Sequence, residues 1–220
     1  MSYGLTLALD GSTYAGSAAV IRDTTLLASR ELSDMAMPGR GGREENFLPM
    51  VASCLADAGV GVVDLDRVVC GSGPGSFTSL RIAASIAKGI AVGAGRPLFA
   101  VPSLMLLVAD VKPGRYLATL GAMRGEVFAG HFEVTTEGRA DELSAVTILG
   151  ENAVVAEAER LGAKALSATV PHARGVSRLL PTVLATGECD IAIWEPTYGR
   201  LAEAQVRWEA THGRPLTAAG

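Results

Sequence analysis

The apolar pattern of the first hundred residues is that of a small sheet with helices. Leu5–Asp10 is a mainly apolar run that ends in a carboxylate, as expected of a buried strand. Two further strands are predicted next, Ser17–Arg22 and Thr25–Glu31, joined by a turn at Asp23-Thr24. Three consecutive strands with tight connections predict a meander. Two further strands are predicted at Asp66–Gly71 and Leu98–Val101.

Two helices are predicted between these strands. The first covers about Glu45–Ala58, with Pro49 near its first turn and Gly59 as its natural end. The second covers about Phe77–Ala94 and follows a glycine-rich turn. Met37–Arg43 precedes the first helix and is predicted to be a flexible loop because it combines a proline, three glycines and two arginines. The first half therefore has the order β-β-β-α-β-α-β.

The second half has a weaker pattern. Its predicted strands are Arg115–Leu120, Glu126–Val134, Leu143–Leu149 and Cys189–Trp194, and its predicted helices are Glu151–Leu161 and His172–Ala185. Both halves begin with strands and continue into α/β alternation, which favours two related lobes, residues 1–102 and a smaller lobe with a C-terminal tail, residues 103–220. The region after His212 is expected to be frayed.

Composition narrows the classes of function. Hydrophobic residues make up 49% of the 220 residues and aromatic residues only 5%, so the core is expected to consist of Val, Leu, Ile and Ala. The net charge of −4 argues against stand-alone binding to RNA, which usually needs a basic face. The chain has three cysteines, Cys54, Cys70 and Cys189. Their odd number and wide spacing argue against a disulfide framework or a zinc site.

Neither a signal peptide nor a membrane span is predicted. Met1–Asp10 has no Lys or Arg and no cleavage pattern. The longest uncharged stretch near the middle of the chain is Pro97–Ala109, and it is too short to span a bilayer. The protein is therefore expected to be soluble and cytoplasmic.

Candidate chemistry starts at the glycine-rich turn between the fourth strand and the second helix. Backbone N–H groups around Gly73, Gly75 and Ser76, with a helix dipole behind them, form a natural anion site. The pattern is neither a Rossmann fingerprint nor a Walker A loop. The alternative is a tight turn that needs glycine for close packing.

Asp10 stands at the end of the first strand beside two hydroxyl residues, Ser12 and Thr13. Such a carboxylate can hold a metal–phosphate group, or it can cap its own turn. The three histidines, His131, His172 and His212, are scattered and have no metal-ligand spacing. No catalytic residue and no metal site is therefore predicted.

The two predicted helices carry more apolar surface than one sheet can cover. In the second helix, Ser85, Gly89 and Gly93 recur every fourth residue and would let another backbone come close, and Lys88 lies in its polar stripe with Arg81. Interior glycines cost a helix about 1 kcal/mol each relative to alanine, so a packing reason is expected. The first helix has a similar excess, and its candidate interface residues are Phe47, Met50 and Cys54. The alternative is that the two helices pack on each other.

Several segments together resemble one protein family. Gly73–Ile82, followed by Ala87-Lys88-Gly89, resembles the defining stretch of the TsaB (YeaZ) family. Other segments are similar to further parts of that family: Leu7–Thr13, Phe47-Leu48-Pro49, Val101–Leu104, Arg124–Phe128 and Glu195–Arg200. The similarity spans about residues 5–200.

The resemblance implies an α/β fold of the actin/Hsp70/sugar-kinase (ASKHA) type with two RNase H-like lobes. It also implies a non-catalytic scaffold that pairs through its first-lobe helices with the catalytic subunit TsaD and acts with the ATPase TsaE. Together they transfer a threonylcarbamoyl group from threonylcarbamoyl-adenylate to N6 of adenosine 37, in tRNAs that read codons beginning with A. The chain alone is expected to be a homodimer without a cofactor. ATP or ADP is expected only at the interface with TsaD, and tRNA only in the complex.

Two departures from the family pattern weaken a nucleotide site. Gly11 stands where threonine is usual, and Gly121 stands where aspartate is usual. An ATPase of this fold needs a carboxylate in the second-lobe turn, and the segment Gly121–Gly125 has none. The His-x-x-x-His metal motif of the catalytic sibling family has no counterpart in Arg43–Phe47.

Two alternatives stay open, a small ASKHA-fold ATPase or kinase and a glycoprotease-like peptidase. If the chain contributes to a tRNA surface, Arg40 and Arg43 in the predicted loop are the best candidates.

Overall fold

The predicted meander forms part of a five-stranded sheet in the computed structural model, which describes residues 3–35, 46–167, 169–199 and 211–213. The strand order is β3-β2-β1-β4-β5, in which β1, β2 and β3 are antiparallel and β4 and β5 run parallel to β1. These strands are β1 (Leu5–Asp10), β2 (Ser17–Arg22), β3 (Thr25–Glu31), β4 (Arg67–Gly71) and β5 (Leu98–Val101). All five strands lie where the sequence pattern predicts them.

One face of this sheet is covered by α1 (Phe47–Asp57) and α2 (Phe77–Ala94). Leu5, Leu7 and Leu9 alternate along β1 and point into the same buried cluster as the apolar sides of both helices. α2 ends at Gly95, whose φ of 61° is the left-handed conformation typical of a helix terminus.

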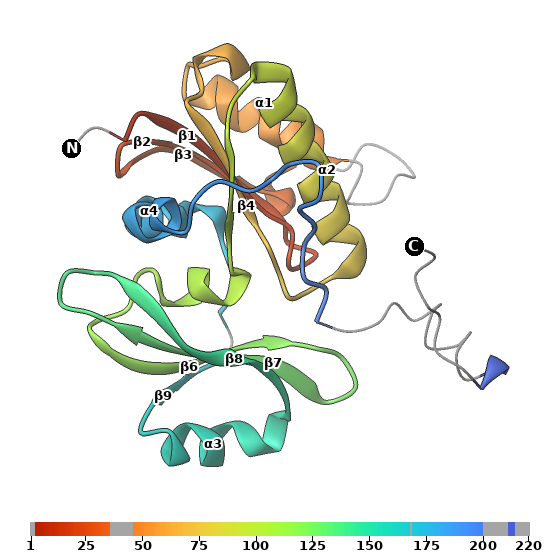
Figure 1. Ribbon diagram of the computed structural model, residues 1–220, viewed down its shortest axis with the longest axis vertical. Coiled ribbons are helices and arrows are strands. Elements are labelled where there is room, and N and C mark those ends of the chain that lie inside the picture. Colours follow the sequence, from red (N-terminus) through yellow and green to blue (C-terminus); the bar gives the residue numbers. More distant parts are fainter. Residues whose placement is uncertain (1–2, 36–45, 168, 200–210, 214–220) are drawn as a thin grey trace.

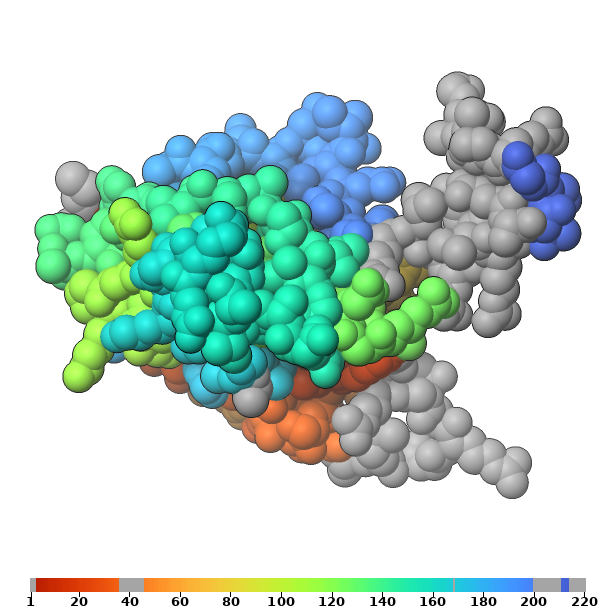
Figure 2. All heavy atoms as spheres, turned by 90° about the horizontal axis from the view of Figure 1, so that it is seen from below, coloured from red at the N-terminus to blue at the C-terminus, as the bar shows by residue number. Residues whose placement is uncertain are grey.

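A second, four-stranded sheet follows in the order β8-β7-β6-β9. Its strands are β6 (Gly114–Gly121), β7 (Glu126–Val134), β8 (Ala140–Gly150) and β9 (Lys164–Leu166), the last of which the sequence analysis missed. The helix α3 (Val154–Arg160) covers its outer face through Val154 and Ala158. From below, α3 and neighbouring residues form the outer surface of this lobe (Figure 2).

The space between the two sheets is filled by apolar side chains. A short 3-10 helix, η4 (Ser103–Val108), and the helix α4 (Val176–Ala185) lie there, so that helices and sheets alternate in layers (Figure 1). A single buried cluster joins the inner face of the first sheet, η4, α4 and the inner face of the second sheet. The two lobes therefore share one hydrophobic core.

After α4 the chain returns to the first sheet as an irregular segment, residues 188–199, which we call the strap. The prediction of a strand at Cys189–Trp194 was wrong, because the backbone there turns around Asp190. The Asp190 carboxylate accepts the N–H of Ala192, and the Asp190 carbonyl accepts the N–H groups of Ile193 and Trp194. The strap is attached instead through single backbone hydrogen bonds, Cys189 N–H to Leu98 O at 2.7 Å and Thr197 N–H to Ser72 O at 2.8 Å.

Some predictions fall on residues outside the described ranges. They are the whole loop Met37–Arg43, with its two arginines, and the tail after Gly213. Among the described helices, α2 is the one long and apolar enough to cross a membrane, by length and composition alone. In the fold its Leu80, Ala83 and Ala87 side chains are fully buried against the first sheet.

His172 fixes the entry into α4 against the first sheet. Its Nδ1 accepts the N–H of Arg174 at 3.0 Å and caps the 3-10 turn η6 (Ala173–Gly175), while its Nε2 lies 3.4 Å from a carboxylate oxygen of Glu31. The neighbouring Ala173 N–H donates to Ser17 Oγ in β2 at 2.9 Å. Burial lowers the pKa of His172, and Arg174 lowers it further, against the opposing effect of Glu31 and Asp34.

The lowered pKa predicts that acid weakens this connection. Since the folded protein binds the His172 proton less readily than the unfolded chain does, stability falls as the pH drops below about 6.5 toward the folded-state pKa. His172→Asn retains an acceptor for the turn but does not titrate. Urea unfolding at pH 8 and pH 5.5 should show a larger loss of stability for the natural protein than for His172→Asn. Equal losses would show that His172 does not contribute to the pH dependence.

Candidate functional site: the glycine-rich turn and the outer face of α2

Asp10 is the centre of a buried hydrogen-bond network. It is 1% exposed, and its Oδ1 accepts both the Ser12 hydroxyl at 2.6 Å and the Ser12 N–H at 3.1 Å. Its Oδ2 accepts the Ser103 hydroxyl at 2.6 Å, and Ser103 Oγ accepts the Gly73 N–H at 3.0 Å. Burial raises the pKa of Asp10 against the lowering effect of these hydrogen bonds. Both carboxylate oxygens are thus used to join three loops.

Three N–H groups of the glycine-rich turn are used internally as well. Ser72 N–H donates to Val101 O at 2.8 Å, Gly73 N–H to Ser103 Oγ, and Ser76 N–H to Ser12 O at 2.7 Å. Anion binding at a helix N-terminus requires such groups to point at the ligand. The structure places five of the candidate phosphate-binding residues close together, namely Asp10, Ser12, Gly73, Gly75 and Ser76, and it favours the packing interpretation of the turn.

Two glycines show why the turn has this composition. A Cβ on Gly75 would collide with the Ser12 carbonyl, and a Cβ on Gly73 would collide with the Thr197 carbonyl of the strap. Gly73 also has a φ of 84°, a conformation that L side chains rarely adopt. Thr13 serves its own turn, since its hydroxyl accepts the Ala15 N–H at 3.2 Å.

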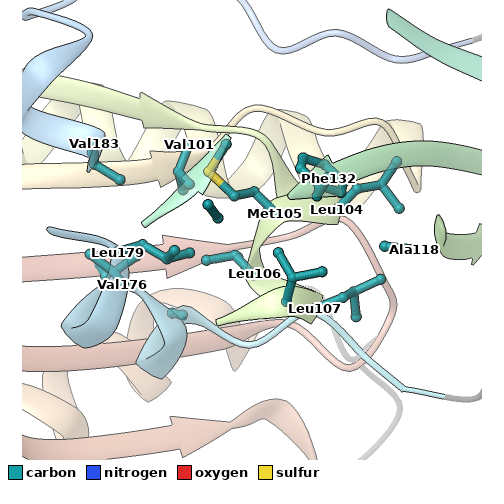
Figure 3. Close-up of a cluster of buried hydrophobic side chains, with 14 of the residues drawn as sticks. Val101, Leu104, Met105, Leu106, Leu107, Ala118, Phe132, Val176, Leu179 and Val183 are labelled. Carbon is teal, nitrogen blue, oxygen red and sulfur yellow. The ribbon is translucent and has the colours of Figure 1, made fainter. Parts of the chain in front are cut away.

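The interlobe space next to Asp10 is occupied by the shared core. Leu104, Met105 and Leu106 of η4 lie in one cluster with Val101 of the first sheet and Phe132 of the second, and Met105 lies between these two residues (Figure 3). Val176, Leu179 and Val183 of α4 lie beside them in the same cluster. A ligand placed in this layer would have to displace these buried side chains.

The outer face of α2 is open. Ser85, Gly89 and Gly93 are exposed, and Val92 between them is 66% exposed. A Cβ added to Gly89 or to Gly93 meets no described atom within 4 Å. The packing of the part of the chain that the structure describes therefore gives no reason for these two glycines, although each costs helix stability.

The predicted interface residues of α1 point the other way. Phe47, Met50 and Cys54 are each 0% exposed and pack against the first sheet, so the prediction that they form an interface was wrong. Burial raises the pKa of the Cys54 thiol to about 11. The error arose because α1 has two apolar stripes and periodicity alone does not tell which one meets the sheet. Leu48, which is 56% exposed, lies on the outer face instead.

A groove of about 320 Å³ lies between α2 and the strap. Lys88, predicted as an interface residue, lines it. The other lining residues are Phe77, Arg81, Ala84, Ser85, Trp194, Glu195, Pro196 and Tyr198. The sequence analysis missed the contribution of the strap to this surface. The resemblance of Glu195–Arg200 to a family motif was the signal that could have suggested it.

The histidines do not assemble a metal centre. His131 lies in β7 and His172 precedes η6, so the two belong to different parts of the fold. Within the residues described, no group of three or more His, Cys, Asp or Glu side chains could hold a metal ion.

Comparisons with known proteins agree with this architecture. The family model described as TsaD, tRNA N6-adenosine threonylcarbamoyltransferase, matches residues 42–170, which is more than half of the chain. The tRNA threonylcarbamoyladenosine biosynthesis protein TsaB of Escherichia coli (strain K12) is 35% identical over 136 residues, which are 60% of this chain and 56% of that protein. The TsaB protein of Bacillus subtilis (strain 168) is 31% identical over 129 residues, 58% of this chain and 54% of that protein.

A solved structure named YeaZ from Pseudomonas aeruginosa superimposes with a TM-score of 0.72 at 25% identity, over 89% of this chain and 99% of that one. The chain belongs to the TsaB (YeaZ) family. Its fold is accordingly the two-lobed ASKHA type expected from the sequence. The matched region spans about half the length of the curated TsaB relatives.

In this TsaB-family chain, the turn glycines and the α2 glycines should respond oppositely to the same change. Gly89→Ala should raise the free energy of unfolding by about 1 kcal/mol, because alanine favours the helix and meets no neighbour. Gly75→Ala should lower it, because the new methyl group overlaps the Ser12 carbonyl.

Urea denaturation of the isolated chain at several protein concentrations measures both effects and separates them from self-association. A loss of stability in Gly89→Ala similar to that in Gly75→Ala would mean that the α2 glycines serve the internal packing of the chain.

Proposed function

We propose that this chain is a non-catalytic scaffold subunit in the formation of N6-threonylcarbamoyladenosine at adenosine 37 of tRNAs that read codons beginning with A. It pairs with a TsaD-type transferase and acts together with a TsaE-type ATPase. The names of the TsaB relatives support the pathway, and the TsaD family model supports a link to the transferase.

The observation that carries this proposal is the open stripe of Ser85, Gly89 and Gly93 on α2. Small residues at every fourth position allow a second helix to approach closely, and here no part of the described chain takes that place. A contact with another subunit gives the two glycines the packing reason that the isolated chain lacks. In the isolated protein the same face would pair two copies of the chain.

The inward orientation of Asp10 supports a scaffold role more than an enzymatic one. Its oxygens hold Ser12 and Ser103, and the space beside it belongs to the core shared by the lobes. Mutual positioning of subunits is a function that a rigid two-lobed body serves well.

The proposed partner also accounts for the charge of the chain. With a net charge of −4, this subunit has few cations to offer to tRNA phosphates, so tRNA is held in the complex mainly by the other subunits.

Reconstitution tests the proposal. The purified chain is mixed with the TsaD-type and TsaE-type subunits of the same organism, threonylcarbamoyl-adenylate and unmodified tRNA, and the modified adenosine is measured by mass spectrometry. Modification should require the chain, and Gly89→Leu should abolish both co-purification with the TsaD-type subunit and modification.

Gly59→Leu is unsuitable as a control because Gly59 has a φ of 66°. Leu143→Ala, on the second sheet, is a suitable surface control and should behave like the natural protein. Modification at the same rate without the chain, or with Gly89→Leu in its place, would contradict the scaffold role.

A further inference from the structure

The strap adds aromatic rings to the flank of α2, where two cations each lie over an aromatic ring. The guanidinium carbon of Arg81 lies 5.3 Å from the centre of the Phe77 ring, and the Phe77 and Tyr198 rings are 4.4 Å apart. The ammonium nitrogen of Lys88 lies 5.8 Å from the centre of the Trp194 ring. Contacts of this kind orient a charged group without neutralising it.

Both cations are available to an outside carboxylate. Across the described part of the chain, the ion pairs join other residues, and neither Arg81 nor Lys88 is within ion-pair distance of an acidic group. Arg81 is exposed and Lys88 is partly exposed, and both side chains line the groove of about 320 Å³. The groove therefore presents two separate positive groups.

The spacing of the cations favours two carboxylates over one phosphate group. Seven residues of an α-helix span about 10.5 Å, or two turns, and Arg81 leans back onto Phe77, away from Lys88. A single phosphate is best held by donors that converge on it, and Glu195 in the same lining disfavours a doubly charged anion. Two acidic residues separated by two turns of a facing helix have the matching spacing.

The groove is continuous with the open stripe of α2. Ser85 lines the groove and is also the first residue of the stripe that continues through Gly89 and Gly93. A helix that packs along the stripe has side chains within reach of the groove.

We propose that the groove receives two carboxylate side chains from the partner helix that packs on α2, and that these side chains lie two helical turns apart on that helix. This inference rests on the proposed function. Arg81 and Lys88 then fix the register of the two helices, while the small residues of the stripe allow them to approach. The strap is part of this recognition surface because Lys88 lies over its Trp194, and its Tyr198 packs against Phe77, the ring over which Arg81 lies.

The test is a binding measurement between this chain and the purified TsaD-type subunit of the same organism, at low and high salt. The double variant Arg81→Glu/Lys88→Glu should bind at least 100-fold more weakly than the natural chain. The neutral variant Arg81→Gln/Lys88→Gln should bind about tenfold more weakly and should lose much of the salt dependence. The double variant Lys112→Glu/Lys164→Glu, at exposed positions of the second lobe, is the matched control and should bind within twofold of the natural chain.

Rescue identifies the partner carboxylates. Acidic residues of the partner's facing helix are changed to lysine, one or two at a time. Binding of the Arg81→Glu/Lys88→Glu chain should be restored when the two lysines lie two helical turns apart. Circular dichroism verifies that the variants are folded.

The outcomes separate this inference from the proposed function. Failure of the natural chain to bind the TsaD-type subunit would overturn both. Binding that is blocked by Gly89→Leu but unchanged in both groove variants would overturn the inference about the groove alone. Binding of ATP or tRNA by the lone chain that disappears in the neutral variant would assign the groove to phosphate and would also overturn it.

Discussion

The carboxylate of Asp10 determines how the first lobe meets the rest of the molecule. Through Ser12 it orders the turn after β1, and through Ser103 it holds both the Gly73 N–H and the start of η4. A buried acceptor of this kind is costly unless its hydrogen bonds are made, so the three loops are fixed together. The end of β1, the glycine-rich turn and the entry to the interlobe core thus form one rigid corner, from which α2 and η4 both start.

That corner connects the shared core to the outer surface. η4 runs directly from Ser103 into the apolar layer between the sheets, where it packs with α4 and the inner face of the second sheet. On the other side, the turn starts α2, whose outer face carries the open stripe, and the strap is hydrogen-bonded to the same turn through Thr197 and Ser72. The layer between the two sheets is therefore filled with apolar side chains, and the outward face of α2 carries the surface on which we propose that a partner helix packs. This division supports a subunit that acts through contact.

The sequence predicted the regular elements well and the irregular ones poorly, for identifiable reasons. Long periodic segments such as Phe77–Ala94 and Glu126–Val134 match the structure at both ends, since apolar spacing and glycine signals agree there. η4 was missed because six consecutive buried residues have no period. Cys189–Trp194 resembled a strand, but the side chain of Asp190 bends the backbone.

The hairpin after β6 uses Met123 and Arg124 at positive φ, where turn rules favour Asn or Gly. The residues near Asp10 were grouped correctly, whereas their inward orientation depends on Ser103, which is 93 residues away in sequence.

The apolar layer between the two sheets leads us to propose that the isolated chain holds no nucleotide between its lobes. Calorimetric titration of the isolated chain with ATP and Mg²⁺ tests this most directly, since an actin-like fold that retains its nucleotide site binds between the lobes. We expect no saturable heat up to millimolar ATP, and the same result for a folded Asp10→Ala variant. Micromolar, saturable binding that Asp10→Ala abolishes would contradict it, because Asp10 would then face a ligand and not the loops that it joins.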